Sequence, residues 1–268
     1  MINAGKMTET PLLLTIKPTK DGSTTLFSEK FDQHYHNPNG AVAESRHVFF
    51  EMPGVPAALN RQDFITIFET GFGTGLNLLL VLEYLEKIVS PPTVIFNSVE
   101  AFPVSPKTVA KFDFGNNTFL NSSKQILSDI FGSLQPGLNQ FELSTHLTFN
   151  LFTGFFDELF EQNAVSGQAD FIFHDPFSPK SNPDLWTVEV FKKLASVSNP
   201  DTVLTTYCAA SSARAAMAAA GWYVARAPGA VGKREMTVAS LSSDKLANFN
   251  RVNEKRLIER LELGDFQY

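Results

Sequence analysis

The chain has 268 residues, of which 43% are apolar and 19% are charged, and its formal net charge is −6. This composition is typical of a soluble globular protein with one large core, and the acidic balance argues against a broadly basic nucleic-acid surface without excluding a local one. No run of about 18 apolar residues occurs, and the N-terminal residues contain no apolar signal core. The single cysteine, Cys208, excludes an intrachain disulfide and a cysteine-based metal cluster. We therefore expect a cytoplasmic protein that neither spans a membrane nor binds a metal.

The first 62 residues are predicted to form an extension of a larger core. Pro11 to Phe31 is predicted to be a β-hairpin, because two apolar runs flank Asp21-Gly22, a strong hairpin-turn dipeptide. The residues that follow are less regular, with a helix expected around Gly40–Glu51. We expect residues 1–62 to pack on the core as a hairpin and a helical segment.

From residue 63 onward, strand-like runs alternate with stretches long enough for helices. Strands are expected near residues 64–69, 93–99, 147–152, 170–174 and 202–207. This order is typical of a parallel sheet with helices on both faces. An alanine-rich helix over Ala209–Ala220, capped by Ser211 or Ser212, precedes two late strands without an intervening helix, which predict an antiparallel hairpin. The core is expected to cover residues 63–241, and the tail, 242–268, to hold one more charged helix.

A glycine-rich turn follows the first strand of this core. Residues 69–77 read Glu-Thr-Gly-Phe-Gly-Thr-Gly-Leu-Asn, so the third glycine comes one position too early for the dinucleotide fingerprint G-x-G-x-x-G. Glu-x-Gly-x-Gly-x-Gly resembles the first motif of S-adenosylmethionine-dependent methyltransferases. A second acid, Glu100, closes the next predicted strand, and an acid at this place in α/β nucleotide sites accepts hydrogen bonds from ribose hydroxyls. In the alternative interpretation, Glu69 and Glu100 are solvated carboxylates at strand ends.

This resemblance implies a fold and a cofactor. The fold is that of α/β class I S-adenosylmethionine-dependent methyltransferases, which is Rossmann-like, with a mostly parallel seven-stranded sheet and an antiparallel terminal hairpin. The cofactor is S-adenosyl-L-methionine, which the turn can approach closely because glycine adopts positive φ without strain. The residues expected to bind it are Glu69, Gly71, Phe72, Gly73, Gly75, Asn77, Glu100, Ala101, Gly154 and Asp175.

A second informative segment starts as a buried strand and ends in a proline-rich loop. In open α/β sheets the carboxyl end of a central strand faces the ligand crevice, so Asp175 is expected at the reaction centre. Asp175-Pro176-Phe177 resembles the Asp-Pro-Pro-Phe/Tyr element of amino-group methyltransferases, in which a carboxylate and the following carbonyl accept hydrogen bonds from the attacking amine. We therefore expect Asp175 and Phe177 to be catalytic. His174 points to the opposite face of its strand and is expected to pack. In the alternative interpretation, Asp175 is a strand-end cap or an ion-pair partner.

Taken together, five segments resemble MnmC-like tRNA (5-methylaminomethyl-2-thiouridine) methyltransferases over roughly residues 23–240. The segments are Ser45–Phe49, Glu69–Asn77, Val99–Pro103, Asp175–Thr187 and Lys233–Met236. The resemblance implies methylation of the aminomethyl group of a modified wobble uridine, in the anticodon stem-loop of tRNA, to methylaminomethyl. Many relatives are fused to a flavin-dependent oxidase for which this chain is too short. We therefore expect the stand-alone methyltransferase form, with a separate enzyme supplying the aminomethyl-uridine precursor.

The candidate contacts with tRNA are mostly cations near strand ends and loops. Trp186 belongs to the family pattern Asn-Pro-x-x-Trp and is expected to contact the substrate. The candidate phosphate contacts are Lys180, Arg214, Lys233 and Arg234. In the alternative interpretation these are ordinary solvated charges, and the tail helix with Lys255, Arg256 and Arg260 is the next candidate.

The sequence departs from the family pattern at two places. Pro176 replaces a more common small residue. Where the family often has Gly-Asp after the third strand, this chain has Gly154-Phe155, and Asp157 comes two positions late. An acid that could meet the adenine amino group is thus missing from its usual position.

Three other functions stay open at this point. The same chemistry could act on a small-molecule amine, which the acidic net charge favours. A catalytically inactive cofactor-fold module that binds RNA or a protein belongs to another class. An aminopropyltransferase shares the sheet and a sulfonium donor, but it would need a denser acidic site around Asp175.

Overall fold

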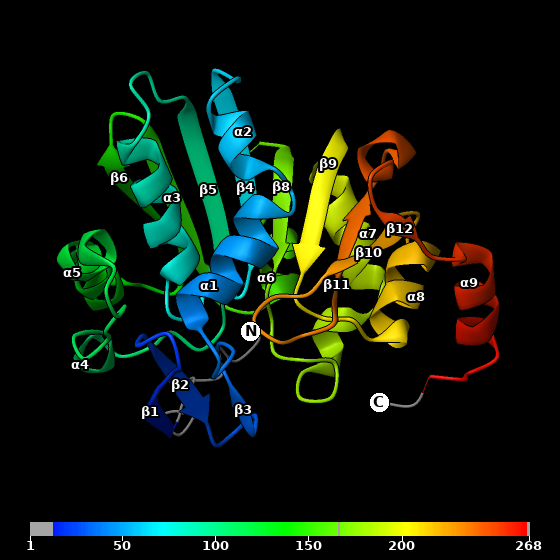
Figure 1. Cartoon of the computed structure of the whole chain (residues 1–268), viewed down its shortest axis with the longest axis horizontal. Coiled ribbons are helices and arrows are strands. Elements are labelled where there is room, and N and C mark those ends of the chain that lie inside the picture. The colour runs from blue at the N-terminus through cyan, green and yellow to red at the C-terminus, as the bar shows by residue number, and fades with distance from the viewer. Residues whose placement is uncertain (1–12, 166, 267–268) are drawn as a thin grey trace, which may run out of the picture.

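The computed structural model describes residues 13–165 and 167–266. Its central layer is a nine-stranded sheet (Figure 1). The strands are β4 (Phe64–Thr70), β5 (Thr93–Glu100), β6 (Gly137–Ser144), β7 (Leu147–Thr153), β8 (Ala169–His174), β9 (Ser198–Thr206), β10 (Tyr223–Pro228), β11 (Glu235–Ser240) and β12 (Asn250–Arg251). Their order in the sheet is β12-β10-β11-β9-β8-β4-β5-β7-β6.

Five neighbouring strands, β9, β8, β4, β5 and β7, run parallel, and the strands outside them pair antiparallel. The predicted fold class is confirmed, including the terminal hairpin of β10 and β11. All seven predicted strands are present, and β6 and β12 extend the sheet by one strand at each edge. The six residues from Ile65 to the end of β4 are buried, as expected for a strand covered on both faces. By contrast, β6 alternates half-buried and exposed residues, which is the burial pattern of an edge strand with one face toward solvent.

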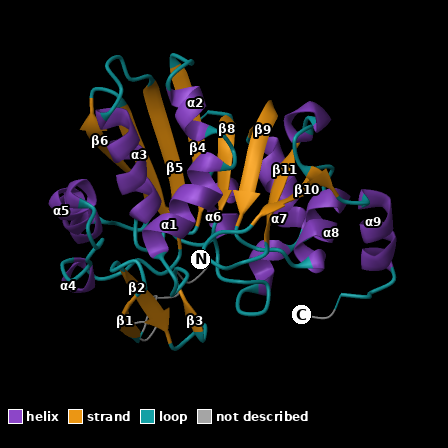
Figure 2. Ribbon diagram, in the orientation of Figure 1, coloured by secondary structure: helices purple, strands orange, loops and turns teal. Residues whose placement is uncertain are grey.

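Helices cover both faces of the sheet, and each face has its own apolar core (Figure 2). The helical elements are α1 (Ala41–Ser45), η1 (Arg46–Glu51), α2 (Val55–Leu59), α3 (Leu76–Glu86), α4 (Pro106–Val109), α5 (Thr118–Ser133), α6 (Phe156–Glu161), η2 (Pro183–Trp186), α7 (Val188–Ser196), α8 (Ser211–Ala219), η3 (Ser243–Leu246) and α9 (Glu254–Glu262). Phe49 and Phe96 belong to the core under η1, α2, α3 and α5. Trp186 and Trp222 belong to the core under α6, α7 and α8. No helix in the described part of the chain is long and apolar enough to cross a membrane.

Two predicted helices differ in detail from the observed ones. The helix expected over residues 40–51 is present, but it continues from α1 into the π-helical turn η1. α8 begins after Ala210, whose side chain cannot cap the helix, so the prediction that Ser211 or Ser212 caps it is wrong. The Ala210 N–H donates to Cys208 Sγ at 3.5 Å.

A separate three-stranded sheet lies beyond the carboxyl ends of the parallel strands (Figure 1). It comprises β1 (Leu14–Pro18), β2 (Thr24–Ser28) and β3 (Gln33–His34). The predicted hairpin around Asp21-Gly22 is confirmed for β1 and β2, while Pro11 and Leu12 lie outside the described residues. This sheet brings the segment after it against the end of the main sheet, where the candidate site lies. The division of the chain at residues 62 and 241 stays a prediction.

Candidate active site

A cavity of about 690 Å³ lies at the carboxyl ends of four parallel strands. Gly71, Glu100, Gly154 and Asp175, which follow or end β4, β5, β7 and β8, all line it. Tyr35 closes it from the side of the N-terminal sheet. The cavity therefore occupies the crevice in which open α/β sheets bind their ligands.

The glycine-rich turn forms one wall of this cavity. Gly71 and Gly73 have φ of 89° and 57°, a region that favours glycine. A Cβ at Gly71 would lie 2.9 Å from the Asp175 carbonyl oxygen, so glycine is required for the two loops to approach. Phe72 also lines the cavity. Gly75 does not line it: a Cβ there would lie 2.5 Å from Leu127, so the predicted cofactor contact of Gly75 is corrected to a packing role against α5.

Glu100 holds the glycine turn with both of its carboxylate oxygens. The backbone N–H of Gly73 donates to Oε2 and that of Phe102 donates to Oε1, each at 2.8 Å. Burial raises the pKa of this carboxyl, and the backbone N–H donors oppose the rise. Glu100 and the next residue, Ala101, line the cavity, which agrees with their predicted position beside a bound cofactor.

Glu69 lies beneath the turn rather than in the cavity. It is 1% exposed and does not line the cavity, so the predicted direct cofactor contact is corrected to a supporting role. Its carboxylate accepts hydrogen bonds from Asn77 Nδ2 at 2.9 Å and from Ser98 Oγ at 2.7 Å. Burial raises the pKa of Glu69 to about 8, against the effect of these two hydrogen bonds. Asn77 does line the cavity, and its contact with the cofactor stays a prediction.

Asp175 follows β8 and lines the cavity, and its backbone carbonyl lies close to Gly71 of the glycine turn. Its backbone N–H donates to the Thr70 carbonyl at 2.9 Å, which fixes where the chain leaves the sheet. Burial raises the pKa of Asp175 well above its usual range, nearby Glu69 and Glu44 raise it further, and Lys233 opposes them. A carboxyl so placed can accept hydrogen bonds from an amine and gains affinity for its proton.

The neighbouring histidine faces the other side of the strand, as expected. His174 is fully buried, its Nε2 lies 3.0 Å from the Leu185 carbonyl oxygen, and its ring packs edge-on against Trp186. Burial lowers the pKa of His174 to about 3. It is thus a neutral packing residue.

Aromatic rings form the wall beside Asp175. Phe177 stacks on Phe31 with ring centroids 4.4 Å apart, and Tyr35 meets Phe177 edge-on at 5.0 Å. Phe31 and Tyr35 carry no sequence signal for this role, because they come from the N-terminal extension. Trp186 is fully buried and its Nε1–H donates to the Phe177 carbonyl at 2.8 Å. The prediction that Trp186 contacts tRNA is therefore wrong, and its role is to hold the loop.

The opposite end of the cavity shows how the chain departs from the family pattern. Gly154 and Phe155 line it, and Phe155 meets Phe102 edge-on with centroids 5.9 Å apart. Asp157 also lines the cavity, although it comes two positions late, and its Oδ1 lies 2.7 Å from Lys193 Nζ. An acid is thus present at this end, where it forms an ion pair with Lys193.

A second cavity, of about 980 Å³, lies next to the first and shares Tyr207 with it. All four predicted cations, Lys180, Arg214, Lys233 and Arg234, line this second cavity rather than the first. Arg226 lines it as well and was not predicted. The cations on α9 line neither cavity.

Two of the predicted phosphate contacts already have protein partners. Arg214 lines the second cavity but is only 4% exposed, and it donates to Thr237 Oγ1 and to the Met236 carbonyl, so its contact with phosphate stays a prediction. Lys233 Nζ lies 2.7 Å from Glu44 Oε1 and 4.5 Å from the centre of the Tyr207 ring. Lys180 and Arg234 are exposed and form no ion pair with any described residue.

The lining fits S-adenosyl-L-methionine in its polar groups. Thr70 Oγ1 and Asn77 Oδ1 belong to cavity-lining residues, are buried, and have no hydrogen-bond partner among the described residues. Buried polar atoms are normally satisfied, so both atoms are available to a ligand that carries N–H or O–H groups. Glu100 adds a carboxylate, and the glycines leave space for a ligand that lies close to the backbone. No group of three or more metal-ligating side chains occurs within residues 13–165 and 167–266.

Comparisons with known proteins agree with this site. Residues 118–242 match a family model described as S-adenosyl-L-methionine-dependent methyltransferase. The chain is 33% identical over 236 residues to the tRNA 5-methylaminomethyl-2-thiouridine biosynthesis bifunctional protein MnmC of Leptospira interrogans, covering 85% of this chain and 35% of that protein. The MnmC protein of Ralstonia nicotianae is also 33% identical, over 85% of this chain and 34% of its own length.

A solved structure shares the fold. The crystal structure of MNMC2 from Aquifex aeolicus superposes with a TM-score of 0.74 at 22% identity, covering 96% of this chain and 77% of that one. The present chain spans about a third of the length of the curated MnmC relatives. The chain belongs to the MnmC-like S-adenosyl-L-methionine-dependent methyltransferases.

Proposed function

We propose that this methyltransferase converts the aminomethyl group of a modified wobble uridine in tRNA to methylaminomethyl. The observation that carries the proposal is the position of Asp175, half-buried in the cavity between the glycine turn and an aromatic wall. The names of the MnmC relatives supply the substrate class. The basic second cavity beside Tyr207 offers a place for the polynucleotide around the target.

The bound cofactor supplies a methyl group on a positively charged sulfur. When bound, it would act as the electrophile, so the acceptor nitrogen would have to present a lone pair and an ammonium would first have to lose a proton. Asp175 accepts hydrogen bonds from the amine N–H groups, which orients the lone pair and assists loss of the proton. Phe177 and Tyr35 exclude water from this position.

The positions of the other residues support specific roles. Glu100 would hold the ribose hydroxyls, Gly71 and Gly73 would leave room for the methionyl part, and Thr70 and Asn77 would receive its polar groups. Lys180, Lys233 and Arg234 would contact tRNA phosphates from the second cavity. The protein would act in the cytoplasm on tRNA that a separate enzyme has already provided with a primary aminomethyl group.

The test is a methylation assay with defined acceptors. Purified protein and S-adenosyl-L-methionine are incubated with tRNA that carries the aminomethyl-uridine, with the same tRNA lacking the modification, and with free aminomethyl-uridine nucleoside. We expect a mass increase of one methyl on the modified tRNA alone, without added flavin. Methylation of the nucleoside at an equal rate would instead favour the small-molecule amine acceptor, and no methylation of any amine would contradict the proposal.

A further inference from the structure

The catalytic loop is tied to the rest of the molecule through one tyrosine. Tyr207 directly follows β9, the strand beside β8, and it lines both cavities. Its hydroxyl donates a hydrogen bond of 2.8 Å to the carbonyl of Pro176, the residue that follows Asp175. Tyr207 thus contacts the backbone carbonyl of the residue next to the proposed catalytic carboxylate.

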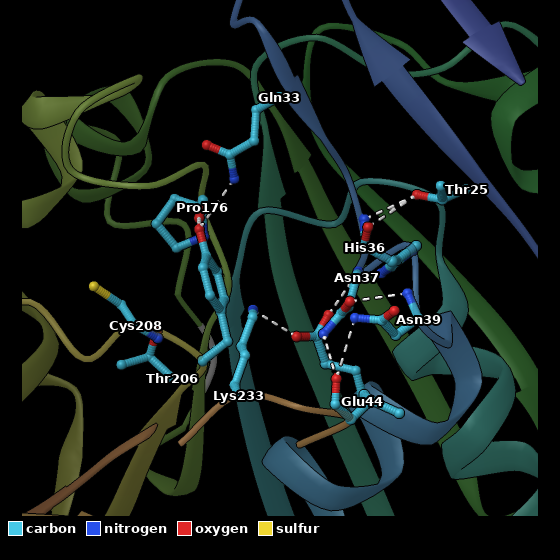
Figure 3. A network of polar contacts seen from close by, with 12 residues as sticks. Thr25, Gln33, His36, Asn37, Asn39, Glu44, Pro176, Thr206, Cys208 and Lys233 are labelled. Carbon is cyan, nitrogen blue, oxygen red and sulfur yellow. Dashed lines mark hydrogen bonds and ion pairs between the residues drawn. The ribbon is translucent and has the colours of Figure 1, made fainter. Parts of the chain in front are cut away.

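The N-terminal sheet holds this tyrosine and the loop together. Gln33 Nε2 lies 3.4 Å from the Tyr207 hydroxyl, and Gln33 Oε1 accepts hydrogen bonds from Ser178 N at 3.1 Å and Ser178 Oγ at 2.7 Å. Figure 3 shows the Gln33 amide nitrogen pointing toward Pro176. One amide side chain therefore contacts both the donor and the loop that receives its hydrogen bond.

A cation fixes the ring from another side. Lys233 Nζ lies 4.5 Å from the centre of the Tyr207 ring and 2.7 Å from Glu44 Oε1. Figure 3 shows Lys233 pointing toward Glu44, whose other oxygen accepts a hydrogen bond from the Asn37 backbone at 2.8 Å. Segments from three distant parts of the chain thus limit the movement of Tyr207.

We infer that Tyr207 is a positioning residue for methyl transfer: held by Gln33, its hydroxyl fixes the Pro176 carbonyl so that this carbonyl and the Asp175 carboxylate share the N–H groups of the acceptor amine. A carbonyl oxygen has two lone pairs, so the bond from Tyr207 leaves one for the amine. Burial and the nearby Asp175 raise the pKa of Tyr207, so the hydroxyl keeps its proton and stays a donor. This inference rests on the proposed function, because it requires an amine acceptor at Asp175.

The test compares Tyr207→Phe with a matched control. Tyr207→Phe removes only the hydroxyl and keeps the ring under Lys233. Tyr223→Phe is the control, because Tyr223 is 42% exposed on β10 and lines neither cavity. We expect Tyr207→Phe to lower the single-turnover rate on aminomethyl-uridine tRNA about 10- to 100-fold, since displacements of about 1 Å at a reacting group have effects of this size. The dissociation constants for S-adenosylhomocysteine and for tRNA should stay within about twofold of the wild type.

A second variant and a second readout separate positioning from folding. Gln33→Leu should lower the rate less than Tyr207→Phe does, because the direct bond to Pro176 remains. In both variants, hydrogen exchange of the peptide over residues 176–182 should become faster while the central strands stay protected. An unchanged rate in Tyr207→Phe, or a loss of S-adenosylhomocysteine affinity equal to the loss of rate, would overturn the inference. A wild-type protein that methylates no amine would overturn the proposed function and this inference together, whereas an active wild type with an equally active Tyr207→Phe overturns the inference alone.

Discussion

The two neighbouring cavities differ in the sign of the charged side chains that line them and in how far these side chains are buried. The first contains the carboxyl groups of Glu100 and Asp175 beside buried Glu69, and burial raises the pKa of all three. The second is lined by several cations, of which Lys180 and Arg234 are exposed and have no ion-pair partner in the described part of the chain. Tyr207 is the wall between them.

This difference predicts where substitutions will have large effects. Electrostatic interactions are strong where water is excluded, and they weaken where solvent and salt surround the charges. A carboxylate of the first cavity should therefore determine rate or cofactor affinity strongly. A cation of the second cavity should change affinity modestly and in a salt-dependent way.

The largest effect is expected at Asp175. Asp175→Ala should lower the turnover of aminomethyl-uridine tRNA by about 10²- to 10⁴-fold, the range of a lost acid–base or positioning group. Cofactor affinity should change much less, because Glu100 and the glycine turn remain. Single-turnover methylation and calorimetry with S-adenosylhomocysteine measure the two quantities. Asp63→Ala is the control, since Asp63 is exposed at the opposite end of β4; a rate near wild type in Asp175→Ala would show that another group orients the amine.

The same residue predicts the direction of the pH dependence. Because burial raises the pKa of Asp175, its charged, hydrogen-bond-accepting form is lost at a higher pH than for an ordinary carboxyl. The rate should fall as pH falls through this raised pKa. Lys233 opposes the rise, so Lys233→Met should move the acidic side of the pH–rate profile to higher pH. An unchanged pH–rate profile in Lys233→Met would show that Lys233 does not affect the pKa of Asp175.

A smaller effect is expected at the ribose position. Glu100→Ala removes the acceptor for the Gly73 and Phe102 N–H groups as well as the proposed ribose contact. The affinity for S-adenosylhomocysteine should fall by about 1–3 kcal/mol, the cost of losing such hydrogen bonds. Calorimetry measures this, with Glu86→Ala at the exposed end of α3 as control. Unchanged affinity in Glu100→Ala would mean that the cofactor lies elsewhere in the crevice.

Much of the fold and the centre of the site could be predicted from the sequence. Gly71, Glu100 and Asp175 each follow or end a strand-like run, so they lie at the carboxyl ends of their strands. Because these strands are parallel, their carboxyl ends meet at one edge of the sheet. The contribution of Tyr35 could not be predicted, since periodicity does not say where an N-terminal sheet docks.

The errors have one physical cause. Trp186 belongs to a motif, yet it is buried and hydrogen-bonded inside the protein. Gly75 belongs to the glycine turn but packs against α5. A motif indicates that a residue matters, whereas only the packing around it shows whether it faces a ligand or supports the residue that does.

The effect of burial on the carboxyl groups at the first cavity can be measured without a ligand, through Glu69. Its pKa is raised from 4.5 to about 8, so the folded protein holds a proton there that the unfolded chain releases. The contribution of Glu69 to stability is therefore fully present below about pH 4.5 and is lost as pH rises to about 8, with a slope of at most about 1.4 kcal/mol per pH unit. Glu69→Gln should flatten this dependence in urea unfolding between pH 5.5 and 8. An equal pH dependence in both proteins would show that Glu69 is ionised in the folded state.

The smallest effects are expected at the exposed cations of the second cavity. Lys180→Gln and Arg234→Gln should each weaken tRNA binding a few-fold and reduce the slope of log affinity against log salt by about one unit, the signature of one lost phosphate contact. S-adenosylhomocysteine affinity should not change, because neither residue lines the first cavity. Lys255→Gln on α9 is the control, since that helix lines neither cavity. Titrations at several salt concentrations compare the three variants.

If Lys255→Gln alone reduces the slope, the tRNA runs along α9 and the second cavity has another role. If Lys180 and Arg234 act as expected, the two cavities have different roles. The exposed cations of the second cavity attract the polynucleotide through solvent, and the buried carboxyl groups of the first cavity orient the amine.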